Sequence, residues 1–361
     1  MKRRDFLAGT AATGTVLASG LATQASAAEP LKVGFIYLGV PGDGGWTYEH
    51  EQARLKMVKH FGNKIETKVI QNVPEGADAE RSITQLCLAG CKLIFTTSFG
   101  YMDPTINVAK KFPNVKFEMC TGYKDAPNVS NYGGRFYQGR AVIGNIAGHM
   151  TKTNKIGYIA TFPIPEVVRG INSAFLYARK VNPKAEMKVV WVNTWFDPPK
   201  EADAAQALID SGVDVLMQHT DSTAAMAKAK DAGILAFGQD SDMMQYAPKP
   251  RISSIMDNWA PYYIQRAQDV MDGKWTAKDS WLGIDTGIVQ VGEISSAVPA
   301  AVKADAMALH DRIKAGTEHV FTGPLNKQDG SAWLKAGETA SDGALLGMNF
   351  YVEGMTGKLP S

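Results

Sequence analysis

Short apolar runs alternate with amphipathic stretches along the chain from residue 31 onward. The apolar runs are four to seven residues long and rich in β-branched and aromatic side chains, which predicts strands at residues 32–38, 66–71, 92–97 and 115–120. The stretches between them have helical apolar spacing, which predicts helices at residues 47–61, 77–89 and 103–112. Strands and helices in strict alternation indicate a parallel sheet with crossover helices.

The same alternation then begins again. Strands are predicted at residues 155–161, 187–192, 214–218 and 234–237. Helices are predicted between them at residues 166–181, 200–211 and 222–232. Two similar modules of about a hundred residues each predict an α/β protein with two doubly wound parallel-sheet lobes rather than one larger sheet, since one domain holds about 100–200 residues.

The chain continues after the second module with a strand at 251–256, a helix at 261–271 and a short strand at 288–291. If this part returned to the first lobe, a multi-strand hinge would join the lobes and let them close on a ligand. We therefore expect a ligand cleft between a first and a second lobe. The first lobe comprises 29–134 and about 259–290, and the second comprises 135–258 and about 291–361.

The N-terminus resembles an export signal. Lys2, Arg3 and Arg4 precede a weakly apolar stretch at 8–22 and a small-residue exit at 25–27. The paired arginines resemble the twin-arginine type. We expect residues 1–28 to be cleaved and the mature protein to be periplasmic, with no lipid anchor because no cysteine stands near the exit.

The charge is almost balanced, with 38 Lys and Arg against 36 Asp and Glu in 361 residues. Removing the three basic residues and Asp5 at the N-terminus leaves 35 of each sign. A neutral body has no field for attracting polyanions, so we expect no nucleic-acid partner.

Catalytic and metal-binding patterns are weak in this sequence. The six histidines have no HxxxH or HExxH spacing, and no GxSxG motif occurs. Cys87, Cys91 and Cys120 form an odd set that predicts buried free thiols rather than a zinc site. We expect no enzyme activity, no metal and no cofactor.

Aromatic side chains follow several predicted strands. In open parallel sheets ligands bind outside the carboxyl ends of the strands. Trp46 comes after the first strand, and two further pairs of aromatics follow later strands. These pairs are Phe99 with Tyr101 and Trp195 with Phe196. Any single one could be a core residue, but together they predict an aromatic box for a flat heterocycle or a sugar face.

Polar side chains occupy the same strand ends. Asp43, Gln218 and Asp240 could accept or donate hydrogen bonds to a ligand. For Asp43 and Asp240 the alternative is a helix N-cap. The glycine-rich loop around Asp43 lacks the lysine and the spacing of nucleotide-phosphate loops, which makes phosphate binding a poor prediction.

These residues together resemble the basic membrane protein family, the purine-nucleoside receptors of bacterial ABC transporters. The similarity covers nearly the whole chain after residue 28. Its landmarks are the Asp43 and Trp46 loop and residues 133–139, 321–325 and 347–354. The resemblance implies a type I periplasmic-binding-protein fold with a purine held between the lobes.

The resemblance also implies roles for individual residues. Trp46 matches the family's stacking aromatic, Trp195 or Phe196 its partner in the second lobe, and Asp240 an aspartate that holds the ligand. Two departures stand out: Asp257 and Asn258 occupy the region where nucleoside receptors place a lysine, and Thr47 begins the pair that replaces Asn-Gln. These changes suggest a smaller, flatter ligand.

We therefore expect an ABC-transporter binding protein that captures a free purine base such as adenine, with purine nucleosides second. Asp43, Asp240 and Asp257 would provide selectivity, and Gln218 or Asn258 would read the ligand's edge. The chain would act as a monomer that docks a membrane permease. Alternatives are a receptor of the same fold for a sugar or another heterocycle, a sensory binding protein, and an exported purine-processing hydrolase.

Overall fold

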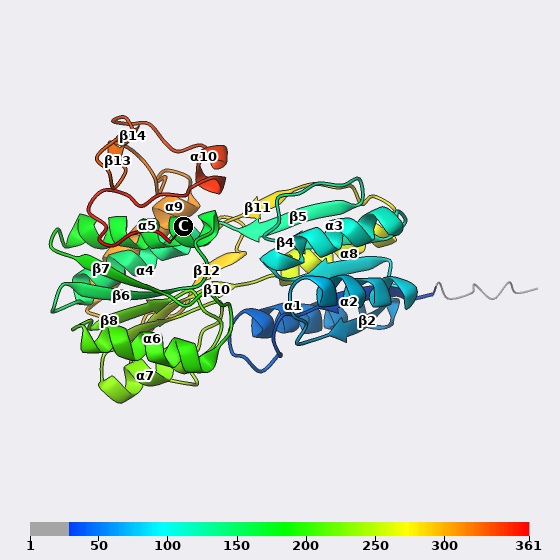
Figure 1. Ribbon diagram of the computed structural model, residues 1–361, viewed down its shortest axis with the longest axis horizontal. Helices are drawn as coiled ribbons and strands as arrows, with labels where there is room; N and C mark the ends of the chain where they lie inside the picture. Colours follow the sequence, from blue (N-terminus) through cyan, green and yellow to red (C-terminus); the bar gives the residue numbers. More distant parts are fainter. Residues whose placement is uncertain (1–28, 361) are drawn as a thin grey trace, which may run out of the picture.

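The computed structural model describes residues 29–360, so the expected export signal at residues 1–28 lies outside the described part of the chain. Two lobes lie side by side, each built on a six-stranded sheet (Figure 1). The strand orders are β11-β5-β4-β3-β1-β2 and β12-β10-β9-β8-β6-β7. Apart from the edge strand at one end, both sheets have the same doubly wound order, as the repeated sequence pattern predicts.

All pairings in the first sheet are parallel. Helices α1 and α8 pack together, as do α2 and α3. Its strands are β1 (Leu31–Ile36), β2 (Ile65–Ile70), β3 (Leu93–Thr96), β4 (Lys116–Cys120), β5 (Val129–Gly134) and β11 (Ser280–Leu282). Its helices are α1 (Trp46–Phe61), α2 (Ala77–Leu88), α3 (Met102–Lys111) and α8 (Ala260–Met271), with short 3-10 turns η1 (Gly62–Lys64) and η2 (Phe99–Tyr101).

The second sheet is parallel except for its edge strand β12, which pairs antiparallel with β10. Helix α4 packs against α5 and α9, and α6 packs against α7. The strands are β6 (Lys155–Ala160), β7 (Glu186–Trp191), β8 (Val215–Gln218), β9 (Leu235–Gly238), β10 (Arg251–Asp257) and β12 (Val289–Val291). The helices are α4 (Phe136–Met150), α5 (Pro165–Val181), α6 (Pro198–Asp210), α7 (Ala224–Ala232) and α9 (Ala300–Lys314).

The chain passes between the two sheets three times within the described residues. The passages lie between β5 and α4, between β10 and α8, and between β11 and β12. The last passage ends before residue 289, because Val289 and Val291 pair with Asp257 and Ile255 of the second sheet. The expected lobe boundary near residue 290 therefore falls within β12.

The segment after α9 forms a separate layer on the second lobe, seen above α5 in Figure 1. It contains the hairpin β13 (Leu325–Asn326) and β14 (Ala332–Leu334) and the short helix α10 (Asp342–Leu346). Asn172 of α5 holds this segment, since its amide donates to the Phe350 carbonyl at 2.8 Å and accepts from the Val352 N–H at 3.1 Å.

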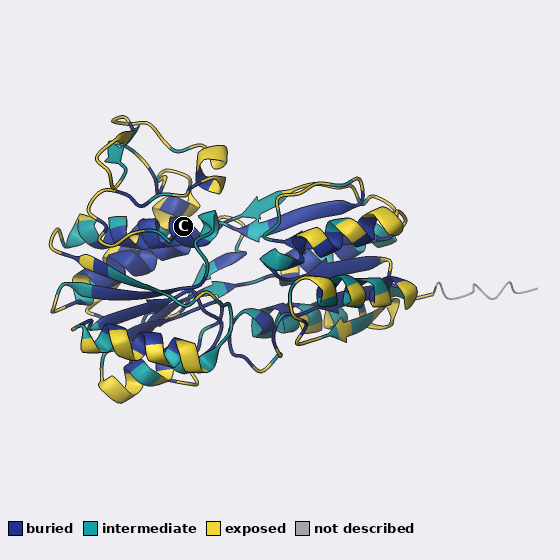
Figure 2. Cartoon of the chain, viewed as in Figure 1, coloured by how far each residue is buried: buried dark blue, intermediate teal, exposed yellow. Residues whose placement is uncertain are grey.

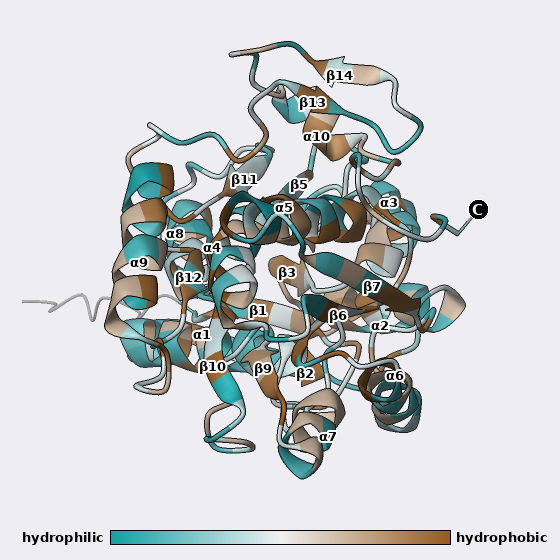
Figure 3. Ribbon diagram, turned by 90° about the vertical axis from the view of Figure 1, so that its left-hand side faces the viewer, coloured by the Kyte–Doolittle hydropathy of each residue, from teal (hydrophilic) through white to brown (hydrophobic). Residues whose placement is uncertain are grey.

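The central strands of both sheets are buried, the edge strands are less so, and the outer faces of most helices are exposed (Figure 2). In Figure 3 hydrophilic and hydrophobic residues alternate along many of the helices. Burial of each apolar face is the main source of stability for this architecture. Cys87, Cys91 and Cys120 are buried and unpaired within residues 29–360. No helix in this range combines the length and the apolarity needed to cross a bilayer.

Candidate functional site

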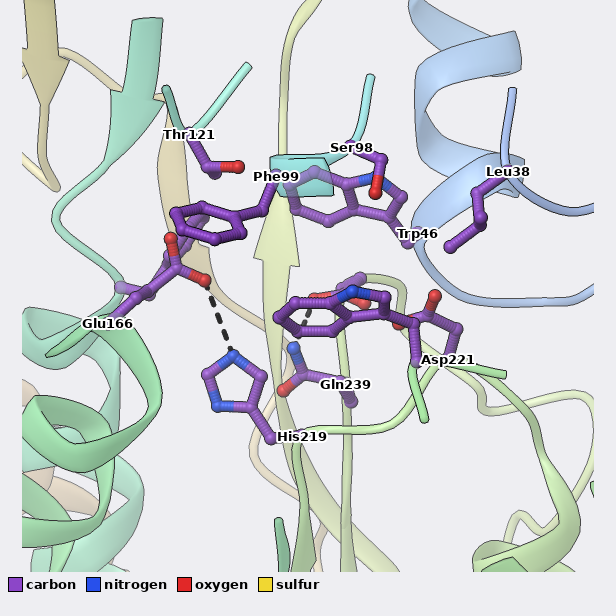
Figure 4. Close-up of a pocket in the computed structure, with 12 residues that line it drawn as sticks. Leu38, Trp46, Ser98, Phe99, Thr121, Glu166, His219, Asp221 and Gln239 are labelled. Carbon is purple, nitrogen blue, oxygen red and sulfur yellow. Dashed lines mark hydrogen bonds and ion pairs between the residues drawn. The ribbon is translucent and has the colours of Figure 1, made fainter. Parts of the chain in front are cut away.

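A cavity opens between the lobes at the carboxyl ends of both sheets. Its lining residues bound about 420 Å³ of space not filled by protein atoms, a volume that includes open solvent. Figure 4 shows Trp46, Phe99 and Ser98 on one side of this cavity and His219, Gln239 and Asp221 on the other. The lining residues are Leu38, Trp46, Ser98, Phe99, Thr121, Phe136, Glu166, Trp195, His219, Asp221, Gln239 and Asp240.

Both lobes contribute aromatic rings to the cavity. Trp46 is the first residue of α1, and its indole N–H donates to the Thr97 carbonyl at 2.6 Å. Edge contacts with His50 and Trp259, at centroid distances of 4.6 and 5.8 Å, fix the ring further. Trp195 belongs to the loop after β7, where its ring packs on that of Phe162 with the ring centroids 5.2 Å apart. A planar ligand between the lobes would thus meet an indole from each.

Carboxylates are the second feature of the site. Asp221 and Asp240 line the cavity and are almost fully buried, and Asp257 lies nearby with neither oxygen hydrogen-bonded. Burial raises the pKa of all three carboxyls well above the usual range, and repulsion from Asp240 adds to the shift at Asp221 and at Asp257. Such groups are costly unless a donor meets them, so the site favours a ligand rich in N–H or O–H groups.

The backbone at Asp240 adopts a left-handed conformation, with φ of 60°. This region is uncommon for residues other than glycine, and aspartate is among the exceptions. The Asp240 carbonyl accepts the N–H of Asp257 at 2.8 Å, which ties the loop after β9 to the passage between the lobes. The conformation therefore connects a cavity residue to the hinge.

One guanidinium supports the floor of the site from α4. Arg140 is buried and donates to the Gln218 carbonyl at 2.9 Å and to the side-chain oxygen of Gln239. The Gln239 amide in turn donates to Asp240. The attraction of Arg140 partly offsets the rise in the pKa of Asp240 that burial causes. This chain orients the Asp240 carboxylate before any ligand arrives.

A contact between the side chains of Glu166 and His219 forms another wall. The carboxylate of Glu166, in the first turn of α5, lies 3.5 Å from His219 Nε2, and Figure 4 marks this pair with a dashed line. The other ring nitrogen of His219 is 3.1 Å from the Tyr158 hydroxyl. Burial lowers the pKa of His219, although Glu166 opposes the shift, so the ring is a neutral hydrogen-bonding group at neutral pH.

Two of the residues expected at the site have other contacts. Asp43 accepts the N–H groups of Gly45, Thr47 and Tyr48 at 2.9 to 3.0 Å, which makes it the organiser of the loop before α1. Burial raises the pKa of Asp43, and these N–H groups pull it back in part. Tyr101 is fully buried in the core beside α2 and α3, where its hydroxyl donates to the Val73 carbonyl at 2.6 Å. Neither residue lines the cavity.

Four further expected residues lie outside the cavity wall. Gln218 points back into the second lobe and donates to the carbonyls of Thr220 and Ser222 at 3.0 and 2.8 Å. Asn258 is half-buried, and its amide lies 3.5 Å from the Gly287 carbonyl. Phe196 and Asp257 are likewise absent from the lining residues. Of the ten residues expected from the sequence, the structure brings four together in the wall of the cavity: Trp46, Phe99, Trp195 and Asp240.

Sequence reasoning missed eight lining residues, and most of them carried the same signal as the four it found. Seven come within four residues after a strand of one of the two sheets, at Leu38, Ser98, Thr121, Phe136, His219, Asp221 and Gln239. Glu166 is the exception, since it reaches the cavity from the first turn of α5. If every position within four residues after a strand had been taken as a candidate, these seven residues would have been included.

Comparisons with known proteins agree with this architecture. The model of the Bmp family, described as PnrA-like ABC transporter substrate-binding protein, matches residues 31–319. A purine-binding protein of Brucella abortus is 58% identical over 96% of this chain and 99% of its own length. A putative ABC transporter glucose-binding protein of Haloferax volcanii is 38% identical over 93% of this chain and 83% of its own length.

Solved structures show the same fold. A solute-binding protein of an ABC transporter system from Aeropyrum pernix superposes with a TM-score of 0.70, covering 82% of this chain and 93% of that one. At 17% sequence identity this likeness concerns the fold alone. It confirms the predicted fold of two parallel-sheet lobes, that of type I periplasmic binding proteins.

Proposed function

Because the chain belongs to the Bmp family of PnrA-like ABC transporter substrate-binding proteins, we propose that it captures a purine between its lobes. Members of this family bind a small molecule outside the cytoplasm and work with a membrane permease. The observation that carries the purine proposal is the pairing of Trp46 and Trp195 across the cavity with buried carboxylates beside them. The name of the Brucella relative, at 58% identity, supports the same ligand class.

Stacking would provide much of the binding free energy. Each base stacked on an aromatic side chain gains about 1–3 kcal/mol in nucleic-acid systems, and two rings could contribute a large share of the roughly 8 kcal/mol of micromolar binding. Trp46 is held in place before the ligand binds, because its N–H is bonded to Thr97. A ring that is already ordered loses little conformational entropy on binding.

The carboxylates would select the ligand through its N–H groups. Asp221 and Asp240 face the cavity, and either one would accept from an exocyclic amino group or a ring N–H. A ligand without donors would leave these buried groups unpaired, which is costly. We favour a free base such as adenine, with purine nucleosides as the second ligand class.

A sugar is the second candidate ligand, and one observation favours it. The Haloferax volcanii relative, 38% identical, carries the name of a putative glucose-binding protein. Aromatic faces and carboxylates also suit sugars, since apolar sugar faces stack on indoles and hydroxyls donate to carboxylates.

A thermal-shift panel on ligand-stripped protein separates the two candidates. Adenine, hypoxanthine, adenosine, glucose and a pentose are compared at equal concentration. At equal ligand concentration, tighter binding to the folded state raises the melting temperature more, so we expect the largest shift with a purine. Shifts with the sugars alone would refute the purine proposal.

Export by the twin-arginine route, absence of a lipid anchor and a monomeric state are further parts of this proposal. Release of the free base from adenosine or inosine during incubation with the protein would instead indicate a purine-processing hydrolase.

A further inference from the structure

The two lobes touch at a point beside the cavity where a side chain has no room. The contact joins the glycine-rich loop between β1 and α1 of the first lobe to the loops that follow β8 and β9 in the second lobe. Gly45, immediately before Trp46, lies directly against the backbone of Asp221. A Cβ atom built on Gly45 would overlap the Asp221 carbonyl oxygen and lie 3.0 Å from its carbonyl carbon.

The same contact includes a hydrogen bond between the lobes. The hydroxyl of Ser241 donates to the Gly44 carbonyl, and both groups are buried. The neighbouring Thr223 and Tyr246 crowd Gly44 as well, with side-chain atoms 2.9 Å from the position of an added Cβ. The first-lobe loop therefore fits closely into the second lobe at these two glycines.

On both lobes the residues of this contact lie next to, or are themselves, residues that line the cavity. On the first lobe, Asp43 fixes the loop by accepting the N–H of Gly45 and of Tyr48, and Trp46 follows. On the second lobe, the N–H of Asp221 donates to the Trp195 carbonyl at 3.0 Å. The distance at which the Gly45 backbone meets Asp221 therefore sets how far apart the two indoles lie.

We propose that Gly45 is a positioning residue, whose missing side chain lets the two lobes approach closely enough to bring Trp46 and Trp195 onto one ligand. A side chain at this position would stop closure before the aromatic rings reach their ligand. This inference does not depend on whether the ligand is a purine, since it concerns the distance between the lobes.

The test compares Gly45→Ala with Gly42→Ala, a matched control in the same loop. Gly42 is exposed, and a Cβ there would meet nothing within 4 Å. Spin labels on Leu55→Cys in α1 and Lys230→Cys in α7, both exposed, report the distance between the lobes. The native cysteines are buried and do not compete for the label.

We expect the wild-type pair and the Gly42→Ala chain to populate the short distance of this structure, with and without adenine. Gly45→Ala should shift to longer distances, and its affinity for adenine should fall about 10- to 100-fold, the equivalent of roughly 1–3 kcal/mol of overpacking. Its melting temperature without ligand should match that of Gly42→Ala, because the crowding arises between the lobes.

A second variant covers the case in which Gly45→Ala does not fold. Ser241→Ala removes the hydrogen bond between the lobes from the opposite side and should lower the ratio of the short-distance to the long-distance population by about 2- to 10-fold. The inference is overturned if Gly45→Ala reaches the short distance as often as the wild type, or if the wild type never reaches it. A wild-type chain that closes but ignores adenine contradicts the purine proposal and leaves this inference supported.

Discussion

At the scale of single residues, Trp46 has the strongest case for contact with the ligand. Its ring lines the cavity, its N–H is bonded to Thr97, and two neighbouring rings hold its edges. Its position at the start of α1 places it on a rigid element rather than on a mobile loop. Such a side chain needs no rearrangement to stack on a ligand.

Replacing Trp46 with Ala should weaken adenine binding about 5- to 150-fold, because one stack worth roughly 1–3 kcal/mol is lost. Trp46→Phe is the matched control, since it keeps a smaller aromatic face while it loses the bond to Thr97. Isothermal titration gives both affinities, and thermal melting checks that the variants fold. Wild-type affinity in Trp46→Ala would show that this ring does not hold the ligand.

Tyr101 should behave in the opposite way. Tyr101→Phe leaves the buried Val73 carbonyl without its donor, so the free energy of unfolding should fall by roughly 1–3 kcal/mol. Adenine affinity should not change, because the residue does not line the cavity. Urea unfolding and titration with adenine on the same preparation test this. Weaker adenine binding at an unchanged free energy of unfolding would show that Tyr101 contacts the ligand.

The positions of Trp46 and Asp43 in the sequence show which features of the site can be predicted from a strand pattern and which cannot. Parallel strands end at one edge of a sheet, so the location of Trp46, Phe99, Trp195 and Asp240 followed from the strand pattern. The direction of a side chain at a strand end depends on local hydrogen bonds. Asp43 turns to the N–H groups at the start of α1, although Gly45 and not Asp43 is the N-cap residue, and no spacing in the sequence distinguishes this role from a ligand contact.

At the scale of elements, helix α1 connects the cavity to a group of acidic side chains between the lobes. Glu49, one turn after Trp46, is partly buried, and burial raises its pKa to about 7. Repulsion from Asp242 of the second lobe and from Asp43 adds to the rise, while Lys56 opposes it. The protonated form of Glu49 is therefore favoured when the lobes are together.

The pH dependence of stability follows from this shift. Because the pKa of Glu49 is raised in the folded state, its contribution to the free energy of unfolding is complete below the ordinary pKa of 4.5. This contribution is lost as the pH rises through about 7. The melting temperature should thus fall between pH 5.5 and 8, and Glu49→Gln should reduce the slope. The buried Asp221, Asp240 and Asp257 act in the same direction, so part of the slope remains. Equal slopes for the wild type and Glu49→Gln would contradict this assignment.

Elements buried on all sides were the hardest to predict. Helix α4 has no amphipathic pattern because most of its residues face α5, α9 or the second sheet. Periodicity detects a helix through the contrast between a wet and a dry face, which α4 lacks. The edge strand β11 was not predicted, since three residues are too few for a period-two pattern, whereas β12 falls within the strand predicted at 288–291.

At the scale of the whole molecule, three passages of the chain join the lobes within residues 29–360, and the candidate cavity lies between the lobes beside the Gly45 contact. The two repeated modules in the sequence were sufficient to predict the two parallel-sheet lobes. The layer formed by residues 320–360 was not predicted, because it depends on distant partners such as Asn172 for the Val352 N–H and Arg135 for Asp342.

The central claim is that the closed cleft holds a purine, and isothermal titration of the ligand-stripped wild type tests it most directly. The protein is unfolded in guanidinium chloride, dialysed and refolded, then titrated with adenine, adenosine and glucose in turn. We predict a single saturable site for adenine with micromolar or tighter affinity, weaker binding of adenosine, and no heat with glucose. Saturable binding of glucose without any heat from the two purines would contradict the account.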